Sequence, residues 1–213
     1  MTKKKLKLLL VDFDGVMSNG RFYNTDKPSQ QDLADTVAAH IFTEDNKQLL
    51  NEWMRGEHSY GDMHKLIEGK AGIPANELDA LLVASVKRMP LNQSMLSFVQ
   101  RLRKAGVVVS LFTNNMDVFD IISRFHHKLD DHFDYIYSSS AYGQLKLEND
   151  VLIRKACQDA HADKDHMAFV DDSLSSFEAA TQYGILTFLY ADYDASQTAF
   201  EEWLLHKFSI DLH

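Results

Sequence analysis

Short apolar runs alternate with helix-like segments along the second half of the chain, and this alternation restricts the fold more than any other feature. The clearest run is Val-Val-Val-Ser-Leu-Phe at residues 107–112. Similar runs predict strands at 6–11, 133–137, 167–170 and 185–190, and helical periodicity is found near 91–102, 116–127, 147–160, 174–182 and 197–207. Strands that alternate with helices pair through right-handed crossovers. The pattern therefore predicts an α/β sandwich built on a mainly parallel sheet.

Residues 31–88 interrupt this alternation, because they contain helical stripes but no strand-like run. One face of a predicted helix in this region carries Leu33, Val37, Ile41 and Phe42. The Met89-Pro90 pair marks the end of the region, since the residue before a proline is pushed out of helical geometry. We therefore expect a core of residues 1–18 and 90–213, with a small helical domain of residues 19–89 inserted after the first strand.

The composition restricts the partners and the compartment. Lys and Arg number 22 and Asp and Glu 31, a net charge of −9, which argues against binding to nucleic acid because that needs a cationic face. The apolar run near the N-terminus is interrupted by Asp12 and Asp14, and no stretch reaches about 18 apolar residues, so neither a signal sequence nor a membrane span is expected. The single Cys157 forms no intramolecular disulfide. These features predict a cytoplasmic protein, either a monomer or a homodimer.

Polar residues gather where the predicted parallel strands end. They are Asp12 and Asp14 after the first strand, Thr113, Asn114 and Asn115 after the second, Lys146 in the loop that follows the third, and Asp171 and Asp172 after the fourth. Ligands of open parallel sheets bind beyond the carboxyl ends of the strands. We therefore expect these side chains to meet at one edge of the sheet.

Each of these residues also has an ordinary structural interpretation. Asp-x-Asp is common turn chemistry, Asp171 and Thr113 can cap the helices that follow them, and Lys146 can be a solvated surface charge. Two carboxylates about 4 Å apart repel each other by about 1–4 kcal/mol, however, so four at one edge require a counter-cation. An acidic, oxygen-rich site suits Mg²⁺ with phosphate oxygens. The combination favours a metal-assisted phosphoryl-transfer centre.

The same residues resemble the motifs of the haloacid dehalogenase-like (HAD) superfamily. Asp12-Phe13-Asp14-Gly15-Val16 is similar to its first motif, Phe112-Thr113-Asn114 to its second, Lys146 to its third and Val170-Asp171-Asp172 to its acidic fourth. The order and spacing of the four motifs agree over nearly the whole chain. The resemblance implies a Rossmann-like three-layer sandwich with a parallel sheet.

The inserted region resembles the helical C1 cap of that superfamily. Its segment Arg55-Gly56-Glu57-His58-Ser59 is similar to Arg-Gly-Glu-Ile-Ser in sugar-phosphatase and epoxide-hydrolase N-domain relatives, and we expect Arg55 to fix the shape of the cap. The third motif departs from the pattern, because relatives usually carry proline where this chain has Leu147. Lys155 is a rival for the role of Lys146, although it lies inside a predicted helix.

The resemblance implies a division of roles among the strand-end residues. Asp12 is implied as the nucleophile that forms an aspartyl-phosphate, and Asp14 as the acid and then the base. Thr113, Asn114 and Lys146 are implied to bind the phosphoryl group, with the amide of Asn114 at a helix N-terminus. Mg²⁺ is implied to be held by Asp12, the backbone carbonyl of Asp14, and Asp172, with Asp171 close by.

The function expected from these residues is Mg²⁺-dependent hydrolysis of a small phosphorylated metabolite, with sugar phosphates among the candidates. Three alternatives remain open. Dehalogenation is disfavoured because dehalogenating relatives generally lack the second aspartate and the magnesium site. A phosphomutase shares all four motifs, and a catalytically silent binding domain shares the fold. The sequence does not name the substrate.

Overall fold

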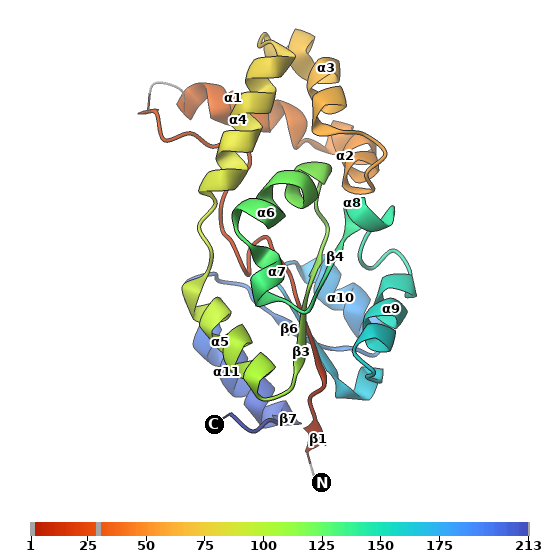
Figure 1. Ribbon diagram of the computed structural model, residues 1–213. Helices are drawn as coiled ribbons and strands as arrows, with labels where there is room; N and C mark the ends of the chain where they lie inside the picture. Colours follow the sequence, from red (N-terminus) through yellow and green to blue (C-terminus); the bar gives the residue numbers. More distant parts are fainter. Residues whose placement is uncertain (1–2, 29–30, 213) are drawn as a thin grey trace.

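A five-stranded parallel sheet forms the centre of the protein (Figure 1). The computed structural model describes residues 3–28 and 31–212. The strands lie in the order β4-β3-β2-β5-β6, and each pairing is parallel. They are β2 (Leu8–Val11), β3 (Val108–Thr113), β4 (Tyr135–Ser138), β5 (Met167–Asp171) and β6 (Leu186–Leu189). The predicted parallel α/β fold is confirmed, although β2 and β6 are shorter than their apolar runs.

Helices cover both faces of this sheet (Figure 1). One face is covered by α5 (Gln93–Lys104) and α11 (Ser196–Lys207), and the other by α9 (Val151–Asp159) and α10 (Leu174–Gln182). The side chains of β2 alternate between the two layers, as a strand requires. Leu9 and Val11 share a buried cluster with Phe98 of α5, whereas Leu8 and Leu10 belong to a second cluster on the opposite face. The central strand is therefore apolar at every position.

Two features of the core are not indicated by the apolar pattern. A short parallel pair joins β1 (Lys4–Lys5) to β7 (Phe208–Ser209). The helix predicted over 116–127 is divided into the π-helical η3 (Phe119–Ser123) and α6 (Arg124–His126), with α7 (Leu129–His132) following. Short helices α8 (Ser139–Tyr142) and η4 (Lys164–His166) complete the core.

The inserted region is helical and lies at one end of the sheet, at the top of Figure 1. Its helices are α1 (Gln31–Ile41), η2 (Glu44–Asn46), α2 (Lys47–Met54), α3 (Tyr60–Ala71) and α4 (Ala75–Arg88). Val37 and Ile41 are buried as their stripe predicts. Phe42 was predicted on the same helical face, but it follows α1 and is 43% exposed. The side chain of Leu33 lies outside the described part of the structure.

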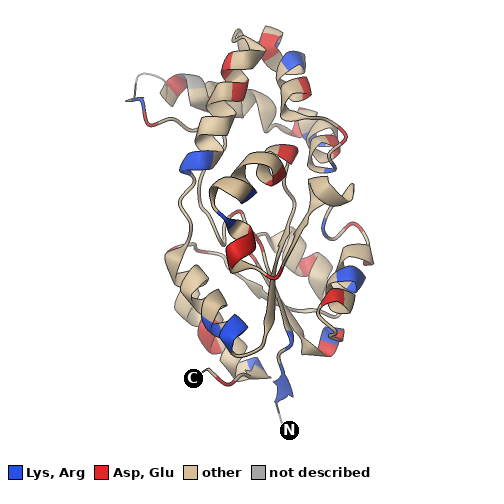
Figure 2. Ribbon diagram, in the orientation of Figure 1, with Lys and Arg blue, Asp and Glu red and all other residues tan. Residues whose placement is uncertain are grey.

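Charged residues of both signs are spread over the helices, whereas β1 is basic (Figure 2). Within residues 3–28 and 31–212, no helix is both long enough and apolar enough to cross a membrane.

Three contacts fix the helical region to the core. The carboxylate of Asp117, which follows β3, accepts a hydrogen bond from Trp53 Nε1 (2.8 Å) and from the backbone N–H of Tyr60 (3.1 Å), the first residue of α3. Arg55 donates two hydrogen bonds to Glu148, at 2.8 and 3.2 Å. At Gly56 a Cβ atom would lie 2.5 Å from the carbonyl oxygen of Ser140. Arg55 thus binds the core rather than acting only within the cap.

We predict that Asp117→Ala destabilises the protein by about 1–3 kcal/mol. The substitution removes the acceptor of the fully buried Trp53 indole and of an N–H at the start of α3, where an acid is favoured. Urea denaturation measures the free energy of unfolding. The matched control is Asp131→Ala, since Asp131 is exposed and belongs to α7 in the core. Equal stabilities of the two variants would show that Asp117 does not help to hold the inserted helices on the core.

Candidate active site

Three adjacent strands deliver the candidate residues to one edge of the sheet. Asp12 follows β2, Thr113 ends β3 and Asp171 ends β5, and these strands lie in the order β3-β2-β5. Lys146, from the loop between α8 and α9, reaches the same place. The structure thus brings together residues that are far apart in the sequence.

Lys146 lies between two carboxylates. Its Nζ is 2.8 Å from Asp12 Oδ2 and 2.6 Å from Asp171 Oδ2, and all three side chains are buried. Burial alone would lower the pKa of Lys146, but the two carboxylates outweigh it and the pKa is raised. Lys146 is therefore a fixed positive charge. The rival Lys155 instead pairs with Asp159 on the exposed side of α9.

The carboxylates of Asp12, Asp171 and Asp172 converge, since one oxygen from each lies within 4.8 Å of the others. Burial raises the pKa of Asp12 against the opposing effect of Lys146, and burial together with the charge of Asp171 raises the pKa of Asp172. One ammonium does not neutralise three carboxylates. The set of hard oxygen donors and its excess negative charge fit a divalent cation such as Mg²⁺.

Gly15 allows Asp172 to take this position. Its φ is +73°, a conformation that favours glycine, and a Cβ atom there would lie 2.0 Å from Asp172 Oδ2. The loop is closed by a hydrogen bond from the Gly15 N–H to the Ser18 carbonyl (2.7 Å). The first motif is thereby folded against the fourth.

Asp14 is held by an asparagine for which no role was predicted. Asn115 Nδ2 donates to Asp14 Oδ2 at 2.9 Å, and Ser139 Oγ contacts both the N–H and the carbonyl of Asn115. Burial raises the pKa of Asp14 to about 7; Lys146 and Asn115 act to lower it, and Asp172 to raise it. A group with this pKa can give and take a proton near neutral pH.

Thr113 and Asn114 occupy different environments. Thr113 is buried, and its hydroxyl has no hydrogen-bond partner among the described residues, as a group awaiting a ligand would be. The side chain of Asn114 accepts a hydrogen bond from the Lys146 backbone N–H (2.7 Å) and so holds the loop that carries the lysine. Helical structure begins only at Asp117, three residues after Asn114. The expected helix N-terminus at Asn114 is therefore displaced.

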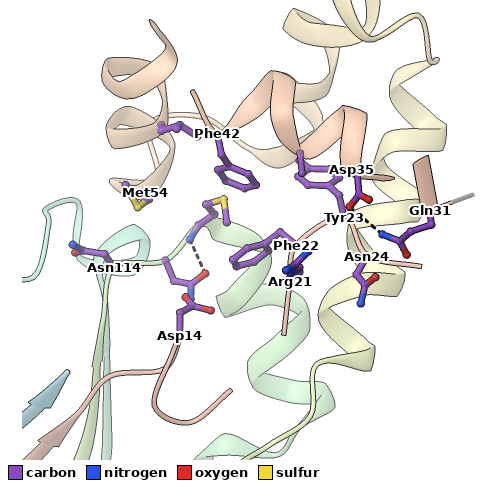
Figure 3. Close-up of a pocket in the computed structure, with 14 residues that line it drawn as sticks. Asp14, Arg21, Phe22, Tyr23, Asn24, Gln31, Asp35, Phe42, Met54 and Asn114 are labelled. Carbon is purple, nitrogen blue, oxygen red and sulfur yellow. Dashed lines mark hydrogen bonds between the residues drawn. The ribbon is translucent and has the colours of Figure 1, made fainter. Parts of the chain in front are cut away.

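A cavity of about 480 Å³ lies between this edge and the inserted helices (Figure 3). Asp14, Asn114 and Asn115 line it from the core. Met116 also lines it from the core, and the other lining residues come from the segment after the first motif, from α1 and the residue that follows it, and from α2. Phe22, Phe42, Leu50 and Met54 are apolar, and Arg21 is charged and exposed. These residues were not predicted from the sequence, because no local pattern distinguishes a cavity wall from a helix core.

The chain belongs to the haloacid dehalogenase-like hydrolases, whose family profile matches residues 9–190. Among characterised proteins it is 26% identical to bifunctional epoxide hydrolase 2 of Rattus norvegicus over 127 residues. That match covers 57% of this chain but 23% of the relative. The chain therefore corresponds to a minor part of this relative's length.

Solved structures of the same family share the fold. A predicted HAD-like hydrolase from Porphyromonas gingivalis superposes with a TM-score of 0.68 at 16% identity, covering 93% of this chain and 98% of that one. A HAD family enzyme from Bacteroides thetaiotaomicron, in complex with magnesium and inorganic phosphate, superposes with a TM-score of 0.61 at 20% identity. That match covers 86% of this chain and 93% of the Bacteroides thetaiotaomicron chain. The L-2-haloacid dehalogenase of Xanthobacter autotrophicus superposes with a TM-score of 0.57 at 14% identity, and the match covers 85% of this chain and 76% of the dehalogenase.

We predict that the affinity for Mg²⁺ rises with pH, because protons compete for the carboxylates of Asp12 and Asp172, whose pKa values are raised. Each of these carboxyl groups also contributes less to the stability of the metal-free protein as the pH rises through its raised pKa. Mg²⁺ should therefore raise Tm more at pH 8 than at pH 6. Calorimetric titration and thermal melts measure both effects.

Two variants accompany this experiment. Asp172→Asn should weaken Mg²⁺ binding, and Asp131→Asn, at an exposed position outside the site, should not change it. Equal affinity at both pH values, or a Tm that does not respond to millimolar Mg²⁺, would overturn the assignment of the metal site.

Proposed function

We propose that this hydrolase is a Mg²⁺-dependent phosphatase that acts on a small phosphomonoester through an aspartyl-phosphate. We divide the chain into a catalytic core of residues 1–18 and 90–213 and a cap of residues 19–89. The observation that carries the proposal is the placement of two aspartates. Asp12 is fixed beside Lys146, and Asp14 lines the cavity next to it.

Asp12 is the nucleophile in this proposal. Its Oδ1 accepts a hydrogen bond from the N–H of Phe13 (2.8 Å) and its Oδ2 contacts Lys146, so the carboxylate has one orientation. Attack on phosphorus forms an acyl-phosphate and releases the alcohol, and water then cleaves the acyl-phosphate. A fixed carboxylate loses little entropy on attack.

Asp14 moves the proton in both half-reactions. Protonated, it donates to the departing alkoxide; deprotonated, it takes a proton from the attacking water. Its pKa of about 7 makes both forms accessible at neutral pH. Asn115 holds the carboxyl toward the cavity, from which the ester oxygen would approach.

The phosphoryl group would be bound by donors at the same edge. Thr113 has a free hydroxyl, and Lys146 supplies positive charge between Asp12 and Asp171. Asn114 places the loop of Lys146. Mg²⁺ would be held by Asp12, the carbonyl of Asp14, Asp171 and Asp172, and when bound it would offset the charge of the phosphoryl oxygens. The magnesium and phosphate in the Bacteroides thetaiotaomicron complex support this assignment.

Haloacid dehalogenation is the main rival, because dehalogenases share the fold. Halide leaves carbon as a stable anion and needs no proton. The departure of halide has no use for an acid with a pKa of about 7 that faces the cavity, and no divalent cation is needed to offset the charge of a phosphoryl group. In phosphate ester hydrolysis the acid protonates the departing alkoxide and the carboxylates hold the cation. The proposal rests on this difference between the two reactions.

We predict that Asp12→Asn lowers turnover by at least about 10⁴-fold, because a neutral amide does not form an acyl-phosphate. Release of phosphate from 4-nitrophenyl phosphate with Mg²⁺ measures the rate, and circular dichroism confirms the fold. Asp131→Asn serves as the matched control and should retain wild-type activity. A wild-type rate in Asp12→Asn would rule out covalent catalysis by this residue.

We predict that Asp14→Asn slows the hydrolysis of an alkyl phosphate by about 10²–10⁴-fold. The loss should be smaller for 4-nitrophenyl phosphate, whose leaving group needs no proton. Asn115→Ala should keep activity, but the pH–rate profile should move to higher pH, because the hydrogen bond from Asn115 lowers the pKa of Asp14. Steady-state rates across pH measure these effects. Equal losses for both esters in Asp14→Asn would exclude it as the acid.

A further inference from the structure

The wall of the cavity between Asp14 and the inserted helices is apolar. Phe22, Phe42 and Met54 lie beside the space above Asp14 in Figure 3. Leu50 and Met116 complete this wall. A volume of about 480 Å³ lies in the range of small-molecule sites, about 300–1000 Å³. Large apolar side chains that line an open, concave surface mark a place where an apolar group binds.

Two polar side chains beside Asp14 already have partners, since Asn115 donates to Asp14 and Asn114 accepts from the Lys146 N–H. The remaining polar lining residues are Arg21, which is exposed and lies beside Phe22, and three residues farther from Asp14. In Figure 3, Asn24, Gln31 and Asp35 lie on the far side of Phe22, and Gln31 Nε2 already donates to Asp35 Oδ1 at 3.0 Å. A sugar phosphate would place hydroxyl groups directly beside the ester oxygen. At this position they would face the rings of Phe22 and Phe42, and burying a hydroxyl without a hydrogen bond is costly.

The wall is held in a fixed shape by Tyr23. This residue has a φ of +54°, which is rare for a bulky side chain and must be held by its surroundings. Its ring is buried, and its hydroxyl lies 2.7 Å from His64 Nε2. His64 Nδ1 in turn lies 2.5 Å from Asp79 Oδ1. The chain of contacts fixes the backbone that carries Phe22, so the apolar wall exists before a ligand arrives.

From these observations, and on the basis of the proposed phosphatase function, we propose that the substrate is the phosphate monoester of an alcohol with an apolar body. The alkyl or ring portion would lie against Phe22, Phe42 and Met54, with the phosphate at Asp12. Turnover breaks the bond between phosphorus and the ester oxygen. Asp14 gives a proton to that oxygen, and water supplies the new oxygen of inorganic phosphate.

A series of n-alkyl phosphates tests this substrate class. Ethyl, butyl and hexyl phosphate have leaving groups of similar basicity, so differences in kcat/KM report binding of the chain in the transition state. We expect kcat/KM to rise by on the order of threefold per methylene, and glycerol 3-phosphate and glucose 6-phosphate to be poorer than hexyl phosphate. A flat series in which glucose 6-phosphate is hydrolysed best would overturn the apolar class and leave the phosphatase function intact.

Cavity variants connect the preference to this wall. Phe42→Asp should bring the ratio of kcat/KM for hexyl over ethyl phosphate close to one. Phe125→Asp is the matched control, because Phe125 is 69% exposed on α6 and does not line the cavity. Met54→Gln, which changes polarity with little change in size, serves if Phe42→Asp does not fold. An unchanged ratio in the folded cavity variant would overturn the proposal.

Binding without turnover separates the proposal from the phosphatase function. Calorimetry with Mg²⁺ compares hexylphosphonate with methylphosphonate, neither of which has an ester to hydrolyse. We expect hexylphosphonate to bind at least about tenfold more tightly, with a negative heat capacity change. If no alkyl phosphate is hydrolysed but this difference is found, the phosphatase function fails and the apolar ligand class is supported. Equal affinities overturn the apolar class.

Discussion

The contact of one buried ammonium with two buried carboxylates determines the arrangement of the site. Lys146 lies within 2.8 Å of both Asp12 and Asp171, which come from neighbouring strands. Without the lysine, these strands would bring two negative charges together in a region without solvent, which is costly. With it, the edge keeps an excess of negative charge that a divalent cation can neutralise. The same residue thus offsets the repulsion between the two carboxylates and leaves a negative charge at the edge that suits a divalent cation.

The parallel sheet explains why residues so far apart in the chain meet here. The carboxyl ends of β3, β2 and β5 lie side by side; Thr113 ends β3, Asp171 ends β5, and Asp12 directly follows β2. Asp12 and Asp171 are buried at the points where β2 and β5 end, so the residues that mark the ends of these two strands also equip the edge. At these two strands, fold and site depend on one feature of the sequence, the change from apolar to acidic residues.

This dependence explains how much could be predicted from the sequence. The strands, their parallel pairing and the meeting of Asp12, Lys146 and Asp171 follow from local patterns joined by one topological rule. The role of Asn115 could not be predicted, because Asn114 and Asn115 are identical side chains whose directions depend on the turn after β3. The cavity was also missed. Phe42 fits a helical stripe, and only the packing of α1 and α2 over the core shows that it lines open space.

The inserted helical region and Lys146 are connected through one short loop. Arg55 of the inserted region binds Glu148, and the Glu148 carboxylate accepts a hydrogen bond from the N–H of Leu145, the residue before Lys146. Asn114 holds the next N–H of the same loop. The inserted helices therefore contact the loop that carries Lys146, which pairs with Asp12 at the edge of the sheet. A ligand in the cavity would rest against elements whose position is tied to Lys146, so in the proposed function substrate selection and the alignment of Asp12 share a common physical support.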